Sequence, residues 1–232
     1  MNSSKLTAQN AYLTEMLRQA GLDAEAQAVA ARIQGVLTDE IHHRMKNMLA
    51  MVTAVVRRSM RSATSIAQAE AAISTRLIAM AKAHDILLKA ELKSAALDTV
   101  IHGAIEQHDT AAARISIQGD AVQIIPASIL PLSLILNELC TNATKYGALS
   151  NHQGSVALTW ALSEKARALI IRWVEKNGPP VAPPVARSFG IRLIEDAIPR
   201  QLGGKGQLLF APTGVEYELH IPYEAVQPQV MA

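Results

Sequence analysis

The sequence has one cysteine and few aromatic residues. With Cys140 alone, no disulfide can form within the chain, which is typical of a protein of the reducing cytoplasm. Cys140 lies in an apolar run, and this position favours a small buried side chain over a nucleophile. Aromatic residues make up 3% of the chain and hydrophobic residues 50%. The core is therefore expected to consist of Leu, Ile, Val, Ala and Met.

The chain also lacks a strong charge of either sign and a long apolar stretch. The formal net charge is +2, from 22 basic and 20 acidic side chains, which gives no argument for nucleic acid or an anionic membrane as a partner. The longest apolar run, residues 125–136, contains two prolines and two serines, and a membrane-spanning helix needs about 18 or more apolar residues. The first residues, MNSSKLTAQNAYL, lack a basic end followed by an apolar block. We expect no nucleic-acid binding and no membrane insertion.

The first third of the chain is rich in helix-forming residues. The pattern predicts a helix over residues 6–20 that Gly21 ends. Asp23 is a good N-cap for a long second helix that continues to about Arg61. We therefore expect an N-terminal helical segment, residues 1–22, that is separate from the helix that follows it.

A third helix is predicted over residues 66–92. Ser65 and Gln68 fit a capping box at its start, after a short polar break. In this helix and in the one before it, apolar residues recur every three or four positions. The two helices therefore predict an antiparallel hairpin, residues 23–94, which would form a four-helix bundle by dimerisation or fold onto the rest of the chain. His84 falls near the apolar seam and is expected to be a hydrogen-bonded structural histidine.

After the hairpin the pattern changes to helices mixed with alternating strands. The predicted helices cover residues 97–107, a segment from Pro126, and residues 189–201. The predicted strands cover residues 114–119, 155–162, 168–174, 206–210 and 215–221. This order predicts a two-layer α/β sandwich with a mixed sheet over residues 95–224, followed by a frayed tail, residues 225–232. The fold class is α+β.

A polar face on the long helix contains the first candidate reagent. Glu40, His43, Arg44 and Asn47 are three or four positions apart and share one face. The apolar seam of the same helix consists of Ile41, Met45, Met48, Val52 and Val55. Because His43 is two residues away from that seam, we expect it to face solvent. An exposed histidine among charged side chains is either an ordinary surface residue or a reagent, and these residues alone leave both interpretations open.

The helix from Pro126 presents a second polar face, formed by Glu138, Asn142 and Lys145 at steps of four and three. An amide oxygen is a suitable ligand for Mg²⁺, which keeps several waters and takes further oxygens from phosphates. A carboxylate can orient one of those waters, and a lysine can neutralise phosphate charge. The same face could equally be solvated and carry an ordinary salt bridge.

Two further segments extend this pattern. A strand that ends in Glu175 runs into Gly178 and several prolines, which places a carboxylate at a turn where the backbone can come close to a ligand. Such a carboxylate can accept the exocyclic amine of adenine. Gly190 stands at the start of a helix, where backbone N–H groups favour an anion. Each signal is weak alone, but their order and spacing together are specific.

These motifs resemble those of a known family. Residues 40–49, EIHHRMKNML, resemble the phosphoacceptor box HRxKNxL of sensor histidine kinases of the HWE family and its close relatives. The segment LNELCTNATKYGALS is similar to their N box, and residues 173–175 match their W-x-E signature. GPPVAPP, SFGIRLIEDAI, QLGG and FAPTG follow the rest of the ATP-binding domain. The resemblance covers residues 39–222 and implies a Bergerat-type ATP fold.

The resemblance implies a role for each matched residue. His43 would be the phosphorylated histidine. The residues around ATP would be Asn142 as the Mg²⁺ ligand, Glu138 as the residue that positions water or acts as a base, Lys145 at the phosphates, Glu175 at adenine, Gly178 and Gly190 around the nucleotide, and Tyr146 beside the base. ATP and Mg²⁺ are thus the implied cofactors. On the phosphoacceptor helix, Glu40 would fix the imidazole tautomer or take its proton, unless it forms an ordinary pair with Arg44.

The implied partner is a response-regulator receiver domain, which Arg44 and Lys46 would meet and which would receive the phosphoryl group on an aspartate. A homodimer is expected from the hairpin seams. About 38 residues precede the phosphoacceptor helix, too few for a sensory domain. The helix over residues 6–20 is then either the remnant of a coiled coil that a sensor would drive or a docking site for a sensor supplied by a separate protein.

Three positions depart from the family pattern. Asn137 occupies the place of the N-box histidine, Asn177 stands where glycine is usual, and Ser188 replaces the first glycine of a GFG motif. The two glycine losses leave open an alternative function, a histidine phosphotransfer or phosphatase module that binds ATP weakly or not at all. A protein-serine kinase of the anti-sigma type would not need the HRxKN helix, and a helical scaffold is the remaining alternative.

Overall fold

The computed structural model describes residues 2–90, 94–106, 108, 114–184 and 187–226, and within helix α1 only part of the side chains. The chain divides into two compact units, residues 1–54 and residues 55–232. None of the helices in the described part of the chain is both long enough and apolar enough to cross a membrane.

Helix α1 (Asn2–Ser62) is a single helix of 61 residues. The predicted stop at Gly21 is therefore wrong, because the helix runs through this glycine without a break. Only Gly203 and Gly214 among the described glycines have a positive φ, so Gly21 does not adopt the left-handed conformation of a C-cap. A glycine inside a helix costs about 1 kcal/mol relative to alanine, which a helix of this length tolerates.

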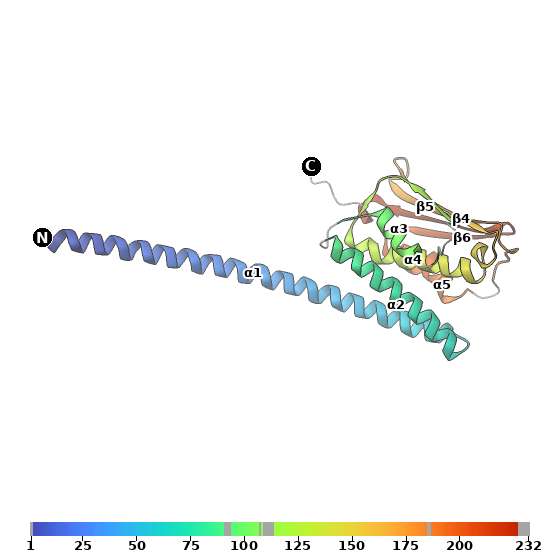
Figure 1. The fold of residues 1–232 in the computed structure, drawn as a ribbon, viewed down its shortest axis with the longest axis horizontal. Helices are drawn as coiled ribbons and strands as arrows, with labels where there is room; N and C mark the ends of the chain where they lie inside the picture. Colours follow the sequence, from blue (N-terminus) through green and yellow to red (C-terminus); the bar gives the residue numbers. More distant parts are fainter. Residues whose placement is uncertain (1, 91–93, 107, 109–113, 185–186, 227–232) are drawn as a thin grey trace. The chain divides into compact units, whose positions relative to one another are not determined.

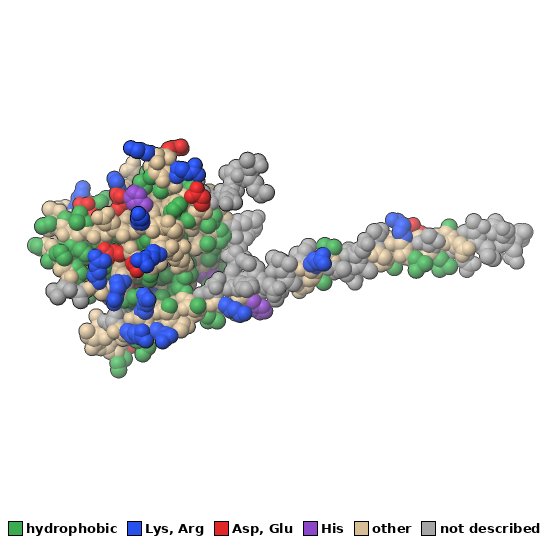
Figure 2. Space-filling view, turned by 180° about the vertical axis from the view of Figure 1, so that it is seen from behind, with side chains coloured by type: hydrophobic (Ala, Val, Ile, Leu, Met, Phe, Trp, Pro, Cys, Tyr) green, Lys and Arg blue, Asp and Glu red, His purple; other side chains and the backbone are tan. Residues whose placement is uncertain are grey.

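The described apolar side chains of residues 1–54 lie largely on the surface, as Figure 2 shows for α1. They include Tyr12, Leu13, Met16, Leu17, Val29, Met45 and Leu49. Met45 belongs to the predicted seam and is 54% exposed, while Met48 and Val52 are half-buried. Several described apolar side chains of this unit are therefore not covered by other described parts of the same unit.

Helix α2 (Ile66–Lys89) begins at the predicted cap. Ser65 has an extended backbone, and its side chain accepts a hydrogen bond from the backbone N–H of Gln68. The Gln68 side chain accepts from the backbone N–H and the hydroxyl of Thr64, one position earlier than in the standard capping box. The side chains of Ser65 and Gln68 thus stabilise the start of α2 and the turn that precedes it.

The sheet unit contains a five-stranded mixed sheet in the order β2-β4-β5-β7-β6. Its strands are β2 (Ile115–Gly119), β4 (Ser155–Ser163), β5 (Ala168–Lys176), β6 (Lys205–Ala211) and β7 (Gly214–Pro222). Strands β2 and β4 are parallel, and the other neighbours are antiparallel. The alternating sequence of these strands buries one face, which contains Leu158, Leu169, Trp173, Tyr217 and Leu219.

Helices α3 (Leu97–Ile105) and α4 (Pro126–Lys145) cover one face of this sheet, together with α5 (Phe189–Arg192) (Figure 1). Helix α2 packs against both α3 and α4. Helix α4 is buried on nearly every side from residue 131 to residue 140, which explains its almost continuous apolar sequence. Cys140 is fully buried, as predicted. The predicted α+β class with a two-layer sandwich is confirmed.

Several local features differ from the prediction. Strands β1 (Ala95–Ala96) and β3 (Gln123–Ile124) form a small antiparallel pair that was not predicted. The helix expected over residues 189–201 contains a π-helical turn, η2 (Leu193–Ala197), between α5 and α6 (Ile198–Gln201). Part of the predicted frayed tail is ordered, because the Val226 side chain is fully buried and its carbonyl accepts from the Ile125 N–H. Residues 227–232 lie outside the described residues.

Candidate nucleotide site

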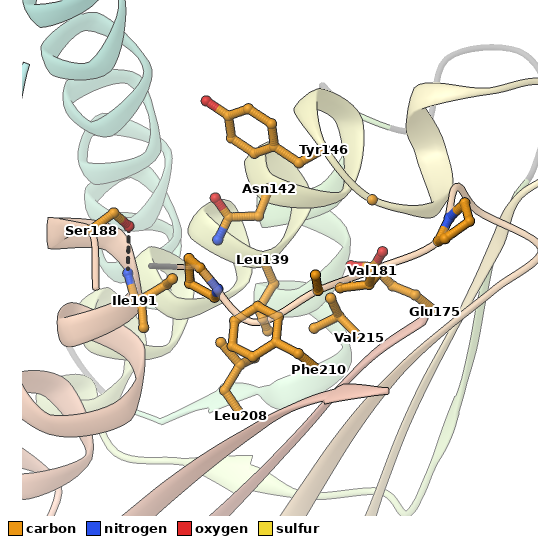
Figure 3. A pocket seen from close by; sticks show the side chains of 14 residues that line it. Leu139, Asn142, Tyr146, Glu175, Val181, Ser188, Ile191, Leu208, Phe210 and Val215 are labelled. Atoms are coloured by element: carbon orange, nitrogen blue, oxygen red, sulfur yellow. Dashed lines mark hydrogen bonds between the residues drawn. The ribbon is translucent and has the colours of Figure 1, made fainter. Parts of the chain in front are cut away.

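A pocket of about 380 Å³ lies in residues 55–232, between the end of α4 and strands β6 and β7 (Figure 3). Asn142 of α4 and Tyr146, directly after the helix, lie on one side of it, and Leu208, Phe210 and Val215 of the strands lie on the other. The remaining lining residues are Leu139, Gly147 and several residues between 175 and 191, a range that includes the proline-rich loop. Such a slot, apolar on both walls with a few polar groups, is suited to a flat ligand with a polar edge.

The end of α4 places three predicted residues at or beside this pocket. Asn142 is half-buried, and Lys145 and Tyr146 are exposed. The helix ends at Lys145, and the N–H of Tyr146 donates to the Asn142 carbonyl. Asn142 and Tyr146 line the pocket, whereas Lys145 does not. Glu138, the third residue of the predicted polar face, does not line this pocket.

Glu175 lies at one end of the pocket and is 3% exposed. One carboxylate oxygen accepts the Ala148 N–H at 2.7 Å, and the other accepts the indole N–H of Trp173 at 3.2 Å. Burial raises the pKa of this carboxyl, although the hydrogen bonds from Ala148 and Trp173 oppose the shift. Glu175 is thus a buried acid that is held by neutral donors.

Three glycines allow close packing around the pocket. A Cβ at Gly147 would lie 2.1 Å from Glu175 Oε2, and a Cβ at Gly178 would lie 2.7 Å from the Ala148 Cα. A Cβ at Gly190 would lie 2.4 Å from Glu138 Oε2. The glycine at 190 is therefore explained by the packing of a carboxylate, a reason that sequence reasoning, which considered only an anion at the helix start, had missed.

Glu138 forms a buried ion pair that was not predicted. It is 4% exposed, and the guanidinium of Arg76 on α2 binds both of its oxygens, at 2.6 Å from Nε and 2.8 Å from Nη2. Arg76 also donates to the Ser59 hydroxyl at 2.7 Å. The sequence does contain one indication of this pair. The three- and four-residue spacing of apolar residues in α2, through Ile73 and Met80, places Arg76 on the apolar face of the helix, where an arginine needs a partner.

The two positions that depart from the glycine pattern are accommodated. Asn177 has a φ of 56°, in the left-handed region that asparagine adopts more readily than most residues. Ser188 has an extended backbone with a φ of −63°, which requires no glycine, and its hydroxyl accepts the Ile191 N–H. Both backbone segments therefore take their conformation without glycine.

The predicted residues of the phosphoacceptor helix belong to residues 1–54. The backbone at Glu40, His43 and Arg44 is helical, but their side chains lie outside the described residues. Lys46 is exposed. The predicted exposure of His43 therefore remains a prediction.

Two further predictions concern single polar groups. His84 is half-buried, and its Nδ1 has no hydrogen-bond partner in the described part of the chain, so the prediction of a hydrogen-bonded structural histidine finds no support at this atom. No group of three or more His, Cys, Asp or Glu side chains in the described residues could hold a metal ion. The single amide oxygen of Asn142 fits an ion that takes most of its ligands from water and phosphate.

Comparison with known proteins identifies the family. Residues 40–121 match the family model described as HWE histidine kinase. The chain belongs to this family. The HWE chain is 35% identical over 213 residues to a blue-light-activated histidine kinase of Brucella anthropi, covering 90% of the chain and 43% of that relative. The corresponding kinase of Brucella ovis is 34% identical, with 85% and 40% coverage.

The HWE chain spans less than half the length of these curated relatives. Among solved structures, it resembles the histidine kinase domain of the Erythrobacter litoralis blue-light-activated histidine kinase, with a TM-score of 0.58 and 17% identity over 76% of the chain and 86% of that domain. A longer structure of the same kinase gives a TM-score of 0.59 at 19% identity, over 79% of the chain and 57% of its own length. These structures support the fold of the HWE chain.

Proposed function

We propose that the chain is an ATP-dependent protein-histidine kinase that autophosphorylates on His43 and passes the phosphoryl group to an aspartate of a response-regulator receiver domain. The observation that carries this proposal is the pocket that Asn142 and Glu175 line, in a chain whose family match includes His43. The activity would take place in the cytoplasm and would use Mg²⁺ with ATP.

The end of the pocket at Glu175 is proposed to bind adenine. A carboxylate has about four acceptor positions, and the Ala148 and Trp173 donors use two of them. The others are available for the exocyclic amine of the base. The flat ring would lie between the apolar strand residues and the loop, with Gly178 at the backbone of the turn and Tyr146 at the open side.

The other end is proposed to bind the phosphates. The Asn142 amide oxygen would be the protein ligand of Mg²⁺, which neutralises charge on the phosphate oxygens when it is bound. Lys145 would add a positive charge, and Gly190 would let its own backbone stay close to the nucleotide. Glu138 would orient a water or act as a base through the acceptor positions that Arg76 leaves unused.

The transfer would require a neutral imidazole on His43. Its nitrogen lone pair forms the N–P bond to the γ-phosphorus while the bond from that phosphorus to the β,γ-bridging oxygen breaks, and ADP leaves. The proton on the other ring nitrogen would pass to Glu40 or to water. Alignment and charge neutralisation supply most of the catalysis in such reactions.

The proposed partners follow from the helical unit. Arg44 and Lys46 would contact the acidic pocket of the receiver domain. The exposed apolar side chains of α1 support a homodimer. A sensor in a separate protein is a further proposal. The phosphotransfer or phosphatase alternative was based on Asn177 and Ser188. Both residues adopt their backbone conformations without glycine, so the backbone at these positions gives no reason to prefer this alternative.

The test is labelling of the purified full chain with ATP that carries a labelled γ-phosphate. We expect an acid-labile, base-stable phosphoryl group that His43→Ala abolishes. His42→Ala is the matched control, because His42 is the neighbouring histidine and is exposed, and it should keep the label. Asn142→Ala should abolish the label with an unchanged circular dichroism spectrum. Labelling that survives His43→Ala would contradict the proposal.

A further inference from the structure

The buried guanidinium of Arg76 on α2 contacts both α4 and the end of α1. It binds Glu138 of α4 with two parallel hydrogen bonds and Ser59 near the end of α1 with a third. The side chains of Arg76 and Glu138 are only 9% and 5% exposed. A bidentate pair of this kind is charge-assisted and geometrically specific, unlike a surface ion pair.

Phe189 adds a further contact to the same guanidinium. The Arg76 Cζ lies 4.9 Å from the centre of the Phe189 ring, close enough for a cation–π interaction. Arg58 lies over the same ring at 5.6 Å. Because Phe189 precedes Gly190, and the space at Gly190 is filled by the Glu138 carboxylate, Arg76 fixes two neighbouring features at once.

This cluster borders a second cavity, of about 140 Å³, that continues the candidate pocket. Arg76, Glu138 and Gly190 line the second cavity only, while Asn142, Tyr146 and Ser188 line both. Lys145 also lines it. Glu138 is one helical turn before Asn142, so the buried carboxylate lies on the side of Asn142 away from Glu175. In the proposed function this is the phosphate end.

We propose that Arg76 is a positioning residue for nucleotide binding, which acts through Glu138. It holds the carboxylate in one orientation against Gly190 and neutralises its charge, so that the phosphate end accepts a polyanion. The inference rests on the proposed function, because it assigns the phosphates to this end. Arg76 comes from α2, so the phosphate end would be completed by a residue of the helix that packs against α4.

The physical reason is charge. Without Arg76, a buried carboxylate would stand uncompensated beside the phosphates, and like charges in a site of low dielectric repel strongly. Adenosine carries no phosphate and would bind at the Glu175 end. Loss of Arg76 should therefore change the affinity for Mg·ATP but not the affinity for adenosine, which a general loss of structure would not do.

The experiment measures dissociation constants of the full chain for Mg·ATP and for adenosine by NMR titration. We expect Arg76→Ala to weaken Mg·ATP binding about tenfold or more, while the adenosine constant changes less than about twofold. Arg76→Lys should give an intermediate loss, because it keeps the charge without the bidentate geometry. In a Glu138→Gln background, Arg76→Ala should change Mg·ATP affinity less than about threefold, because the charge to be compensated is gone.

The matched control is Arg172→Ala, which removes an arginine that pairs with Glu218 on the sheet, outside both cavities. It should leave both dissociation constants unchanged.

Equal losses of affinity for Mg·ATP and adenosine in Arg76→Ala would overturn the inference. An undiminished loss of Mg·ATP affinity in the Glu138→Gln background would also overturn it. If Arg76→Ala does not fold, Arg76→Lys is used instead, and the ratio of its dissociation constants for Mg·ATP and adenosine is compared with the wild-type ratio. A wild-type chain that binds adenosine and Mg·ATP, with a ratio unmoved by these variants, overturns this inference alone. A wild-type chain that binds neither overturns the proposed function and this inference with it.

Discussion

The candidate pocket and the second cavity that continues it each contain one buried glutamate, and the two are stabilised in opposite ways. Glu138, 4% exposed, is paired with a buried cation. Glu175, 3% exposed, is held by two neutral N–H donors. Burial costs a carboxylate its hydration in both places, but only at Glu138 does a full positive charge compensate for it.

This contrast fits the proposed division of the pocket. An end that accepts phosphates cannot keep an uncompensated negative charge. An end that accepts the amine of a base needs a negative acceptor that is not already neutralised by a cation. The charges on the remaining surface are mixed, as Figure 2 shows, so the selectivity for a nucleotide would depend on these buried groups more than on an overall field.

The largest effect is expected when the pair at Glu138 is broken. Glu138→Ala leaves the Arg76 cation buried and unpaired, which typically costs about 3–5 kcal/mol. We expect a loss of this size in the free energy of unfolding, measured by urea denaturation of the full chain. A double variant, Arg76→Met with Glu138→Leu, should recover most of it, because no buried charge remains. A loss under about 1 kcal/mol in Glu138→Ala would show that the pair is not buried in solution.

Much of this arrangement could be predicted from sequence, and the rest could not for definite reasons. The steps between Glu138, Asn142 and Lys145 were enough to place them on one helix, and alternation predicted the main strands. The Arg76–Glu138 pair joins residues 62 positions apart, so no local pattern contains it. The same holds for the hydrogen bond from Ala148 to Glu175, since this donor comes from another element.

Local rules failed where the surroundings decided the outcome. Glycine at position 21 is a residue type that often ends a helix, but α1 continues through it. No atom outside the helix backbone lies within 4 Å of a Cβ built at Gly21. Strands β1 and β3 have only two residues each, too short for an alternating pattern. Glycine is usual in the family at positions 177 and 188, but Asn177 adopts a left-handed conformation that asparagine tolerates, and Ser188 an extended one that needs no glycine.

A smaller effect is expected at Glu175 and depends on pH. Because burial raises its pKa, the folded chain binds this proton more tightly than the unfolded chain. The Glu175 contribution to stability is therefore present at low pH and is lost as pH rises from the ordinary value, about 4.5, through the raised pKa. Glu175→Gln cannot titrate. We expect the wild-type chain to lose stability relative to this variant over that pH range.

The measurement is a series of urea denaturation curves for both chains between pH 4 and pH 7. Glutamine also places an NH₂ group against one of the two N–H donors, which costs about 1–3 kcal/mol at every pH. This constant offset does not change how the difference in unfolding free energy between the two chains varies with pH, and that variation is the quantity compared. A difference between the two chains that stays constant with pH would contradict a raised pKa at Glu175.

The smallest effect is expected at Glu218, a partly exposed carboxylate on the same sheet. A hydrogen bond from His220 and the pairing with Arg172 lower its pKa, so its contribution to stability is present above about pH 4.5 and is lost as pH falls through the lowered pKa. The pH dependence of the free energy of unfolding that Glu218 contributes is thus opposite in sign to the contribution of Glu175. Because solvent screens the pair, we expect Glu218→Gln to cost less than about 1 kcal/mol at pH 7, and less at high salt. A cost as large as that of Glu138→Ala would mean that burial does not separate the three carboxylates, and the contrast between the two ends of the pocket would then need another cause.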